Sequence, residues 1–368
     1  MQFIDLKKQY KLIEDKILAR ITNVLNHGQY IMGEEVLLLE QTLAEFVGSK
    51  YAIVNSSGTD ALFMSLLALD LSPDDEIITT PFSFFSAAEV IVLCNARPVF
   101  VDINPDTYNI DVNKITAAIT KKTKAIIPVS LYGQMANMTM INKIAVEYNL
   151  AVIEDAAQSF GATHNQQYSC AVSTVGCTSF FPSKPLGGYG DSGACFTNDD
   201  ILAQKLIEIR IHGQSGRYYH NRIGINGRMD TLQAAILLEK MQLLPQEILL
   251  RQQIAARYNN LLGDIVKIPY IEPGNTSVFA QYTIEVPNRD QFQQHMNQLD
   301  IPTAIHYPLA MHQQHALLFL GYQTGSFPYA EKAGQNVISL PMHPYLTMEE
   351  QDIIVAGVKS SLLSGKTV

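Results

Sequence analysis

The sequence predicts an α/β protein with a mostly parallel central sheet and a smaller α+β domain at its C-terminal end. Two observations support this fold class. Short apolar runs, typical of fully buried strands, alternate with helical patterns through the first two thirds of the chain. Polar residues, glycines and a lysine directly follow several of these runs, at the strand ends where such sheets bind ligands.

The strands are predicted from apolar runs bounded by turn signals. They cover residues 51–55, 76–80, 98–102, 125–128, 151–154, 177–181 and 194–197. Helical periodicity predicts helices over 61–69, 140–148 and 199–210. A longer helical pattern covers 231–243 and continues past Pro245 over 246–262, where it would link the two domains.

The last third of the chain predicts a strand at 281–286, a helix at 289–299 and a further segment at 304–307. We therefore expect a large domain over residues 1–245 and a small one over 246–368. A chain of 368 residues, 47% hydrophobic and 17% charged, is long enough to form both.

Composition and charge exclude several classes of protein. No apolar run approaches the ~20 residues of a membrane span. The N-terminal residues lack the order of a secretory signal, so we expect a cytoplasmic protein. The four cysteines show no metal-binding spacing, so we expect free thiols and no metal site. A net charge of −9 without a basic cluster argues against nucleic-acid binding.

Lys184 lies between an aromatic strand and a glycine-rich turn, in the stretch 178–193. A lysine in this setting can lie out of bulk water beside a flat ligand and form a Schiff base. The ordinary alternative is a solvated surface lysine. The apolar residues before Lys184 and the glycines after it favour the sheltered position.

Asp155 follows the apolar strand 151–154, and Gln158 comes three residues later. A carboxylate here can pair with the ring nitrogen of pyridoxal phosphate and keep it protonated. Gln158 could contact the phenolic oxygen of the ring if the segment begins to turn as a helix. The alternative for Asp155 is the N-cap of that helix. With Lys184, these residues indicate pyridoxal phosphate chemistry.

Two further stretches could hold parts of such a cofactor. Residues 55–62 form a strand end, a turn of small residues and a helix start, which suit a phosphate dianion or a simple N-cap. Phe84 follows the strand 76–80 and could stack on a pyridine ring or bury itself in the core.

Candidates for substrate recognition come later in the chain. Asn226 and Arg228 precede the helical pattern 231–243, and His306 and Tyr307 stand next to a proline. All four could also be ordinary loop residues.

The motifs resemble the sugar-nucleotide aminotransferases of the DegT/DnrJ/EryC/StrS family. The resemblance covers nearly the whole chain, and its most specific matches are Ser-Gly-Thr-Asp-Ala-Leu at 57–62, Glu-Asp-Ala-Ala-Gln at 154–158 and Ser-Phe-Phe-Pro-Ser-Lys at 179–184. It implies the aspartate aminotransferase-like fold (fold type I), pyridoxal 5'-phosphate as cofactor, and a homodimer with shared active sites.

The same resemblance implies a role for each site residue. Lys184 would form the Schiff base and move the proton, and Asp155 would pair with the ring nitrogen. The remaining cofactor contacts would be Gln158 on the ring oxygen, Phe84 on the ring face, Gly58, Thr59 and Ser179 on the phosphate, and Asn226 on the phosphate from the neighbouring subunit.

Residues 125–134, 178–188 and 230–238 resemble, more narrowly, family members that aminate UDP-2-acetamido-2-deoxy-3-oxo-glucuronate with glutamate, for bacterial surface polysaccharide such as O-antigen. This implies substrate contacts by Tyr30, Arg228, His306 and Tyr307. The alternatives are a C3 or C4 aminotransferase of another dTDP- or UDP-linked keto sugar, and a non-catalytic binding or regulatory protein. A dehydratase of this fold has histidine at the lysine position, so Lys184 argues against it.

Overall fold

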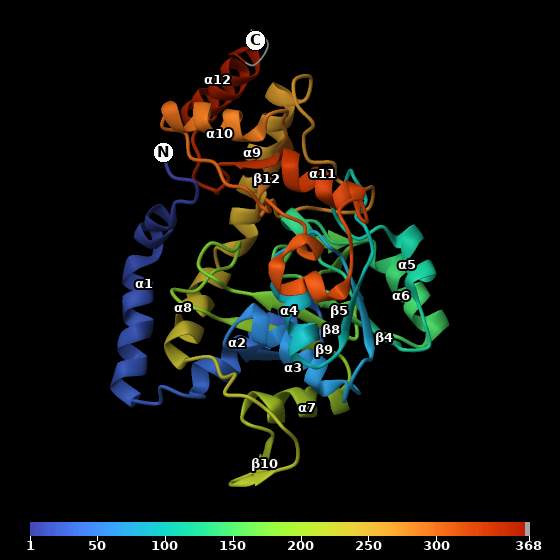
Figure 1. The fold of residues 1–368 in the computed structure, drawn as a ribbon. Helices are drawn as coiled ribbons and strands as arrows, with labels where there is room; N and C mark the ends of the chain where they lie inside the picture. The colour runs from blue at the N-terminus through green and yellow to red at the C-terminus, as the bar shows by residue number, and fades with distance from the viewer. Residues whose placement is uncertain (365–368) are drawn as a thin grey trace.

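A seven-stranded sheet forms the centre of the molecule, in the order β1-β9-β8-β5-β4-β2-β3 (Figure 1). The computed structural model describes residues 1–364. Four of the six strand pairings are parallel, and β9 alone runs antiparallel to its neighbours, so the predicted mostly parallel sheet is confirmed. Its strands are β1 (Tyr51–Asn55), β2 (Glu76–Thr79), β3 (Arg97–Phe100), β4 (Thr123–Ile127), β5 (Ala151–Asp155), β8 (Val175–Ser179) and β9 (Gly193–Thr197).

Both faces of this sheet are buried. In β2, Ile77 belongs to one hydrophobic cluster and the next residue, Ile78, to another. In β5, Ile153 and Val152 are divided in the same way. Successive side chains of a strand point to opposite faces, so a sheet covered on both sides requires continuous apolar strands.

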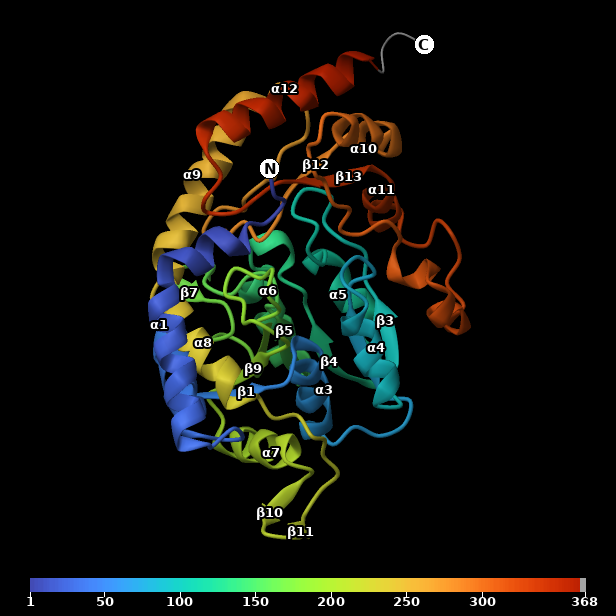
Figure 2. The same cartoon turned by 90° about the vertical axis from the view of Figure 1, so that its left-hand side faces the viewer.

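Helices form the layers on the two faces (Figures 1 and 2). The helix α3 packs on β8, β9, α4 and α7, whereas α2 packs on β1 and α8, and α1 lies along α8. The helices of this part are α1 (Leu6–His27), α2 (Glu34–Val47), α3 (Gly58–Ala68), α4 (Ser86–Leu93), α5 (Val112–Ala118), α6 (Met138–Tyr148), α7 (Asp200–Arg210) and α8 (Thr231–Met241).

The C-terminal part has a hydrophobic cluster of its own, built around Tyr258, Tyr282 and Ile338. Residues 310–337 instead pack on the cluster of the large sheet that contains Ile77. A domain boundary at residue 245 stays our proposal, and residues 365–368 of that domain lie outside the described residues. Its elements are α9 (Leu244–Leu262), β12 (Tyr282–Glu285), α10 (Arg289–Gln298), α11 (Pro328–Asn336), β13 (Val337–Leu340) and α12 (Met348–Ser364), with short 3-10 helices at Met311–Gln313 and His315–Leu320.

All seven predicted strands of the central sheet are present, with bounds that differ by at most two residues. The helical pattern 231–262 divides into α8 and α9 at Gln242 and Leu243. Several elements were not predicted from the sequence. They include the helices α1, α2, α4, α5, α11 and α12 and the strand β13. Smaller ones are a 3-10 turn at Leu131–Gly133, the pair β6 (Thr163–His164) and β7 (Gln167–Tyr168), and the projecting hairpin of β10 (Gln214–Gly216) and β11 (Tyr219–His220) (Figure 2).

One local expectation was wrong. The segment after Asp155 forms consecutive turns, not the start of a helix. Asp155 is therefore not an N-cap, and Gln158 reaches the site from a turn. Across residues 1–364, no helix combines the length and apolar character that crossing a membrane would require.

Candidate active site

The candidate site forms where the carboxyl ends of β5 and β8 meet the beginning of α3. Asp155 is the last residue of β5, and its partner in β8 is Cys177. Ser179 therefore lies two residues beyond this pairing, at the same edge of the sheet. Gly58, the first residue of α3, lies directly against Ser179. A Cβ added to Gly58 would lie 2.6 Å from the Ser179 Cβ.

The Asp155 carboxylate is buried with one oxygen available. The backbone N–H of Ala157 donates to Oδ1 at 3.1 Å, and no described residue donates to Oδ2. Burial raises the pKa of Asp155, while the Ala157 N–H and the charge of Lys184 act in the opposite direction. A free carboxylate oxygen in a buried position suits a ring N–H donor.

Lys184 lies in the turn after β8, where its backbone N–H donates to the Phe181 carbonyl at 2.9 Å. The side chain is partly buried, and its Nζ forms no hydrogen bond or ion pair with another described residue. Burial lowers the pKa of Lys184, and attraction to Asp155 offsets this only in part. The Lys184 amine therefore loses its proton more readily than the amine of an exposed lysine.

Gln158 is buried and its amide is held at both ends. The backbone N–H of Tyr132 donates to Oε1 at 2.8 Å, and Nε2 donates to the Tyr307 hydroxyl at 3.1 Å. Since the acceptor end is occupied by a backbone group, the NH₂ end faces the site. Such a donor suits the phenolic oxygen of the expected cofactor.

Phe84 is 56% exposed, so it is not a core phenylalanine. Its ring centroid lies 6.2 Å from that of Tyr307, with the planes tilted by 47°. The neighbouring Phe82 is fully buried in the main hydrophobic cluster instead. The structure therefore leaves the Phe84 ring accessible beside Tyr307, as a ring-stacking role requires.

The beginning of α3 offers unpaired donors beside Ser179. The backbone N–H groups of Gly58 and Thr59 donate to no described acceptor, whereas the N-cap Ser57 accepts from the Asp60 N–H at 3.0 Å. The Asp60 carboxylate is itself held by the Ser56 hydroxyl. Free N–H groups at a helix N-terminus, next to a serine hydroxyl, suit a phosphate.

His306 and Tyr307 approach the site from the C-terminal part of the same chain. The His306 Nδ1 lies 3.0 Å from the Ser339 Oγ, and its carbonyl accepts from the Tyr132 hydroxyl. Burial, and secondly the charge of Lys184, lower the pKa of His306 to about 4. His306 is therefore neutral at physiological pH.

Three predicted substrate or cofactor residues lie elsewhere on the chain. Tyr30 is 49% exposed, and its carbonyl accepts from the Thr231 N–H at 2.9 Å, near the start of α8. Arg228 lies close by, and its buried Nε has no partner among the described residues. Asn226 is exposed. No hydrogen bond connects any of the three to Lys184 or Asp155 within residues 1–364.

Two residues outside the predicted set of site residues also support the site. Glu154 is buried on the opposite face of β5, where it accepts from the Ser130 hydroxyl at 2.9 Å and the Cys170 N–H at 2.8 Å. Burial raises the pKa of Glu154 to about 7. The other is Tyr132, which binds both Gln158 and His306. Their partners are remote in sequence, so no local pattern reveals these roles.

These residues fit pyridoxal phosphate as a set. The free Asp155 oxygen suits the ring nitrogen, the Gln158 NH₂ suits the ring oxygen, and the unpaired N–H groups of Gly58 and Thr59 suit the phosphate. The close approach of Gly58 to Ser179 leaves no room for a side chain, so the phosphate would contact backbone there.

Comparison with known proteins agrees with this fit. The model of the DegT/DnrJ/EryC1/StrS aminotransferase family matches residues 11–359. The chain is 52% identical to the UDP-2-acetamido-2-deoxy-3-oxo-D-glucuronate aminotransferase of Pseudomonas aeruginosa, over 97% of this chain and 99% of that relative. It is also 44% identical to a pleiotropic regulatory protein of Geobacillus stearothermophilus, over 96% of each chain.

Among solved structures, the chain resembles that of Ntda from Bacillus subtilis, which has the cofactor PMP bound. The TM-score is 0.89 at 33% identity, over 98% of this chain and 83% of that one. PMP is the pyridoxamine form of pyridoxal phosphate.

Proposed function

Because the chain belongs to the DegT/DnrJ/EryC1/StrS aminotransferase family, we propose that it transfers the amino group of glutamate to C3 of UDP-2-acetamido-2-deoxy-3-oxo-glucuronate. The enzyme class, a pyridoxal phosphate-dependent aminotransferase, follows from the family. The observation that supports this particular sugar is the 52% identity, over 97% of the chain, with a relative of that activity.

Each site residue has a task in this reaction. Bound pyridoxal phosphate carries the amino group between the two substrates and withdraws electrons from the bond that breaks. The Lys184 Nζ takes up a proton and returns it, for which a neutral amine is required. The Asp155 carboxylate would keep the ring nitrogen protonated, and the Gln158 Nε2 would donate to the ring oxygen.

The substrate's charges suggest the remaining roles. The buried Arg228 Nε has no partner within residues 1–364, and a guanidinium is well suited to the carboxylate of a uronate. His306, Tyr307 and Tyr30 would contact the rest of the nucleotide sugar. Asn226, exposed in the single chain, would reach the phosphate of a second subunit in a homodimer.

We propose a place for the product as well. A 3-amino uronate linked to UDP would be used to build bacterial surface polysaccharide, such as the O-antigen of lipopolysaccharide. The enzyme would act in the cytoplasm. Both statements rest on the family resemblance.

A panel of amino sugars tests the substrate. The protein loaded with pyridoxal phosphate is mixed with 3-amino and 4-amino sugars linked to UDP or dTDP, with and without the C6 carboxylate, and with glutamate. Conversion of the pyridoxal spectrum to the pyridoxamine spectrum is expected with glutamate and, among the sugars, fastest with the UDP-linked 3-amino uronate.

Other outcomes would each select an alternative. Preference for a 4-amino or dTDP-linked sugar would assign the chain to another sugar aminotransferase. No conversion with any amine would favour a regulatory role, the activity that the name of the Geobacillus relative suggests. Lys184→Ala is the negative control, since it removes the reacting amine.

A further inference from the structure

Tyr132 lies in a short turn, Leu131–Gly133, next to the carboxyl end of β5. Ser130, the residue before the turn, donates its backbone N–H to the Asp155 carbonyl at 2.9 Å and its hydroxyl to Glu154 at 2.9 Å. The N–H of Leu131 donates to the Asn109 side chain at 2.9 Å. These bonds attach the turn to the strand that carries Asp155.

The backbone of Tyr132 is unusual for a residue with a side chain. Its φ of +58° lies in the left-handed region, which a tyrosine seldom occupies. Such a conformation persists only where the surroundings enforce it. Here it directs the Tyr132 N–H to Gln158 and the ring away from the turn.

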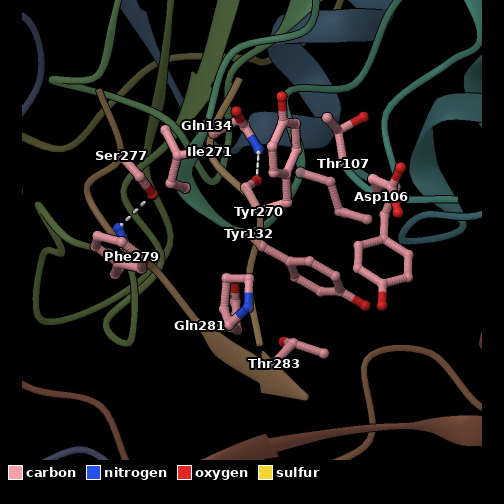
Figure 3. Close-up of a pocket in the computed structure, with 13 residues that line it drawn as sticks. Asp106, Thr107, Tyr132, Gln134, Tyr270, Ile271, Ser277, Phe279, Gln281 and Thr283 are labelled. Carbon is pink, nitrogen blue, oxygen red and sulfur yellow. Dashed lines mark hydrogen bonds between the residues drawn. The ribbon is translucent and has the colours of Figure 1, made fainter. Parts of the chain in front are cut away.

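The ring of Tyr132 is buried between the large sheet and the C-terminal part. Figure 3 shows it among the residues that line a small cavity, with Gln134 and Tyr270 on one side and Thr283 of β12 on the other. Its centroid lies 5.5 Å from that of Tyr108, edge to face at 71°. The Tyr132 hydroxyl, at the end of this ring, donates to the His306 carbonyl.

We infer that the Tyr132 hydroxyl is a positioning group: it fixes the His306–Tyr307 segment of the C-terminal part against the end of β5, where Asp155 and Gln158 lie. This inference rests on the function proposed above, because it assigns His306 and Tyr307 to the sugar substrate. One tyrosine thus holds Gln158 by its backbone and His306 by its side chain.

The two bonds predict separable effects. Tyr132→Phe keeps the backbone N–H, so the hydrogen bond to the Gln158 Oε1 remains. Loss of the hydroxyl leaves the partly buried His306 carbonyl without its donor and frees the segment to move. Substrate recognition therefore depends on the hydroxyl, whereas the Tyr132 N–H holds the Gln158 Oε1 without it.

Tyr132→Phe tests this, with Tyr108→Phe as the matched control. Tyr108 contributes to the same cavity, but its hydroxyl donates to Glu285 at 2.7 Å and not to the site. In the holoenzyme, Tyr132→Phe should raise KM for the UDP-sugar about tenfold, the size expected for one lost hydrogen bond. The rate of the glutamate half-reaction and the visible absorbance should match the parent.

Hydrogen exchange gives a readout that needs no substrate. A peptide spanning residues 301–308 should exchange about tenfold faster in Tyr132→Phe and at the parent rate in Tyr108→Phe. Equal exchange in the two variants, or an unchanged KM, would overturn the inference. If the proposed sugar is wrong, the parent enzyme fails to use it, while the exchange experiment still decides the role of Tyr132.

Discussion

At the level of single residues, the site keeps two ionisable groups where burial opposes their charge. Burial lowers the pKa of Lys184 and raises that of Asp155, and their mutual attraction only partly offsets these shifts. Each group is thereby held closer to its neutral form than in water. This arrangement would serve the proposed proton transfer, and it costs stability.

Replacing the lysine should show this cost. Because burial outweighs the attraction to Asp155, we expect Lys184→Met to raise the melting temperature of the cofactor-free protein at pH 7. Because the pKa of Lys184 is lowered in the folded state, its charge destabilises the fold fully at any pH below that pKa. This destabilisation disappears as the pH rises towards the ordinary value of 10.5, so the difference between the two proteins should narrow.

The melting temperatures of the parent and of Lys184→Met, measured from pH 7 to 10.5, check this prediction. A difference that widened with pH would contradict the assignment of the penalty to Lys184. Lys205→Met is a suitable control, since the Lys205 Nζ donates to the Ala68 carbonyl at 2.9 Å and pairs with Asp70 at the surface.

Residue-level prediction was limited where the sequence offers equivalent neighbours. Phe84 could be predicted either as a ring-stacking or as a core residue, and Phe82 occupies the same short stretch. Only the packing separates them: Phe82 is fully buried, whereas Phe84 is more than half exposed beside Tyr307. The local sequence around these two residues does not indicate which ring packs in the core.

At the level of elements, strand ends and helix starts were predictable, but their approach to one another was not. The pattern at 55–62 predicted a phosphate site from a turn before a helix. That α3 begins in direct contact with Ser179 of β8 depends on how the sheet and helix pack. This contact explains why glycine stands at position 58.

Gly58→Ala should disrupt that contact. The added Cβ would lie 2.6 Å from the Ser179 Cβ, so α3 must shift from the strand. We expect a loss of roughly 1–3 kcal/mol in stability, typical of overpacking. Affinity for pyridoxal phosphate should fall as well, as measured by fluorescence titration of the cofactor-free protein.

Gly216→Ala provides the comparison. Its added Cβ would meet only the Tyr219 ring, at an ordinary distance of 4.0 Å. If both variants lost cofactor affinity equally, the close approach at Gly58 would not be the cause.

The helix predicted after Asp155 does not form, and its absence has a physical cause. The Asp155 side chain accepts from the Ala157 N–H two residues on, a local bond that competes with helix formation. Phe160 is drawn into the hydrophobic cluster under α8, and Gly161 has a φ of +93°. Tertiary burial and turn chemistry together override the helical tendency of the intervening alanines.

At the level of the whole molecule, the predicted site residues form two groups. Lys184, Asp155, Gln158, Phe84 and Tyr307 meet within one chain. Tyr30 and Arg228 lie together near the start of α8, with Asn226 exposed close by. A homodimer with shared sites would bring the second group of one subunit to the first group of the other.

Mixing inactive variants tests such sharing. Lys184→Ala and Asn226→Ala subunits, refolded together, should regain activity that neither has alone. A mixed dimer then contains one site with both native residues. With random association, half of the dimers are mixed, so about a quarter of the sites should be intact.

Refolding each variant alone supplies the baseline for that experiment. Recovery absent at every mixing ratio would show that Asn226 acts within its own chain or not at all. Sedimentation of the mixture confirms that dimers have formed.

The sequence by itself determined the fold class, the order of the strands along the chain, and the motifs that carry Lys184, Asp155 and Gln158. These depend on local patterns, since buried strands must be apolar and strand ends must carry the polar groups. Tertiary structure alone decided the order of strands across the sheet, the contact of Gly58 with Ser179, and the link from Tyr132 to His306. Those features join residues that are remote in sequence, and only the packing of the sheet against its helices and the C-terminal part specifies them.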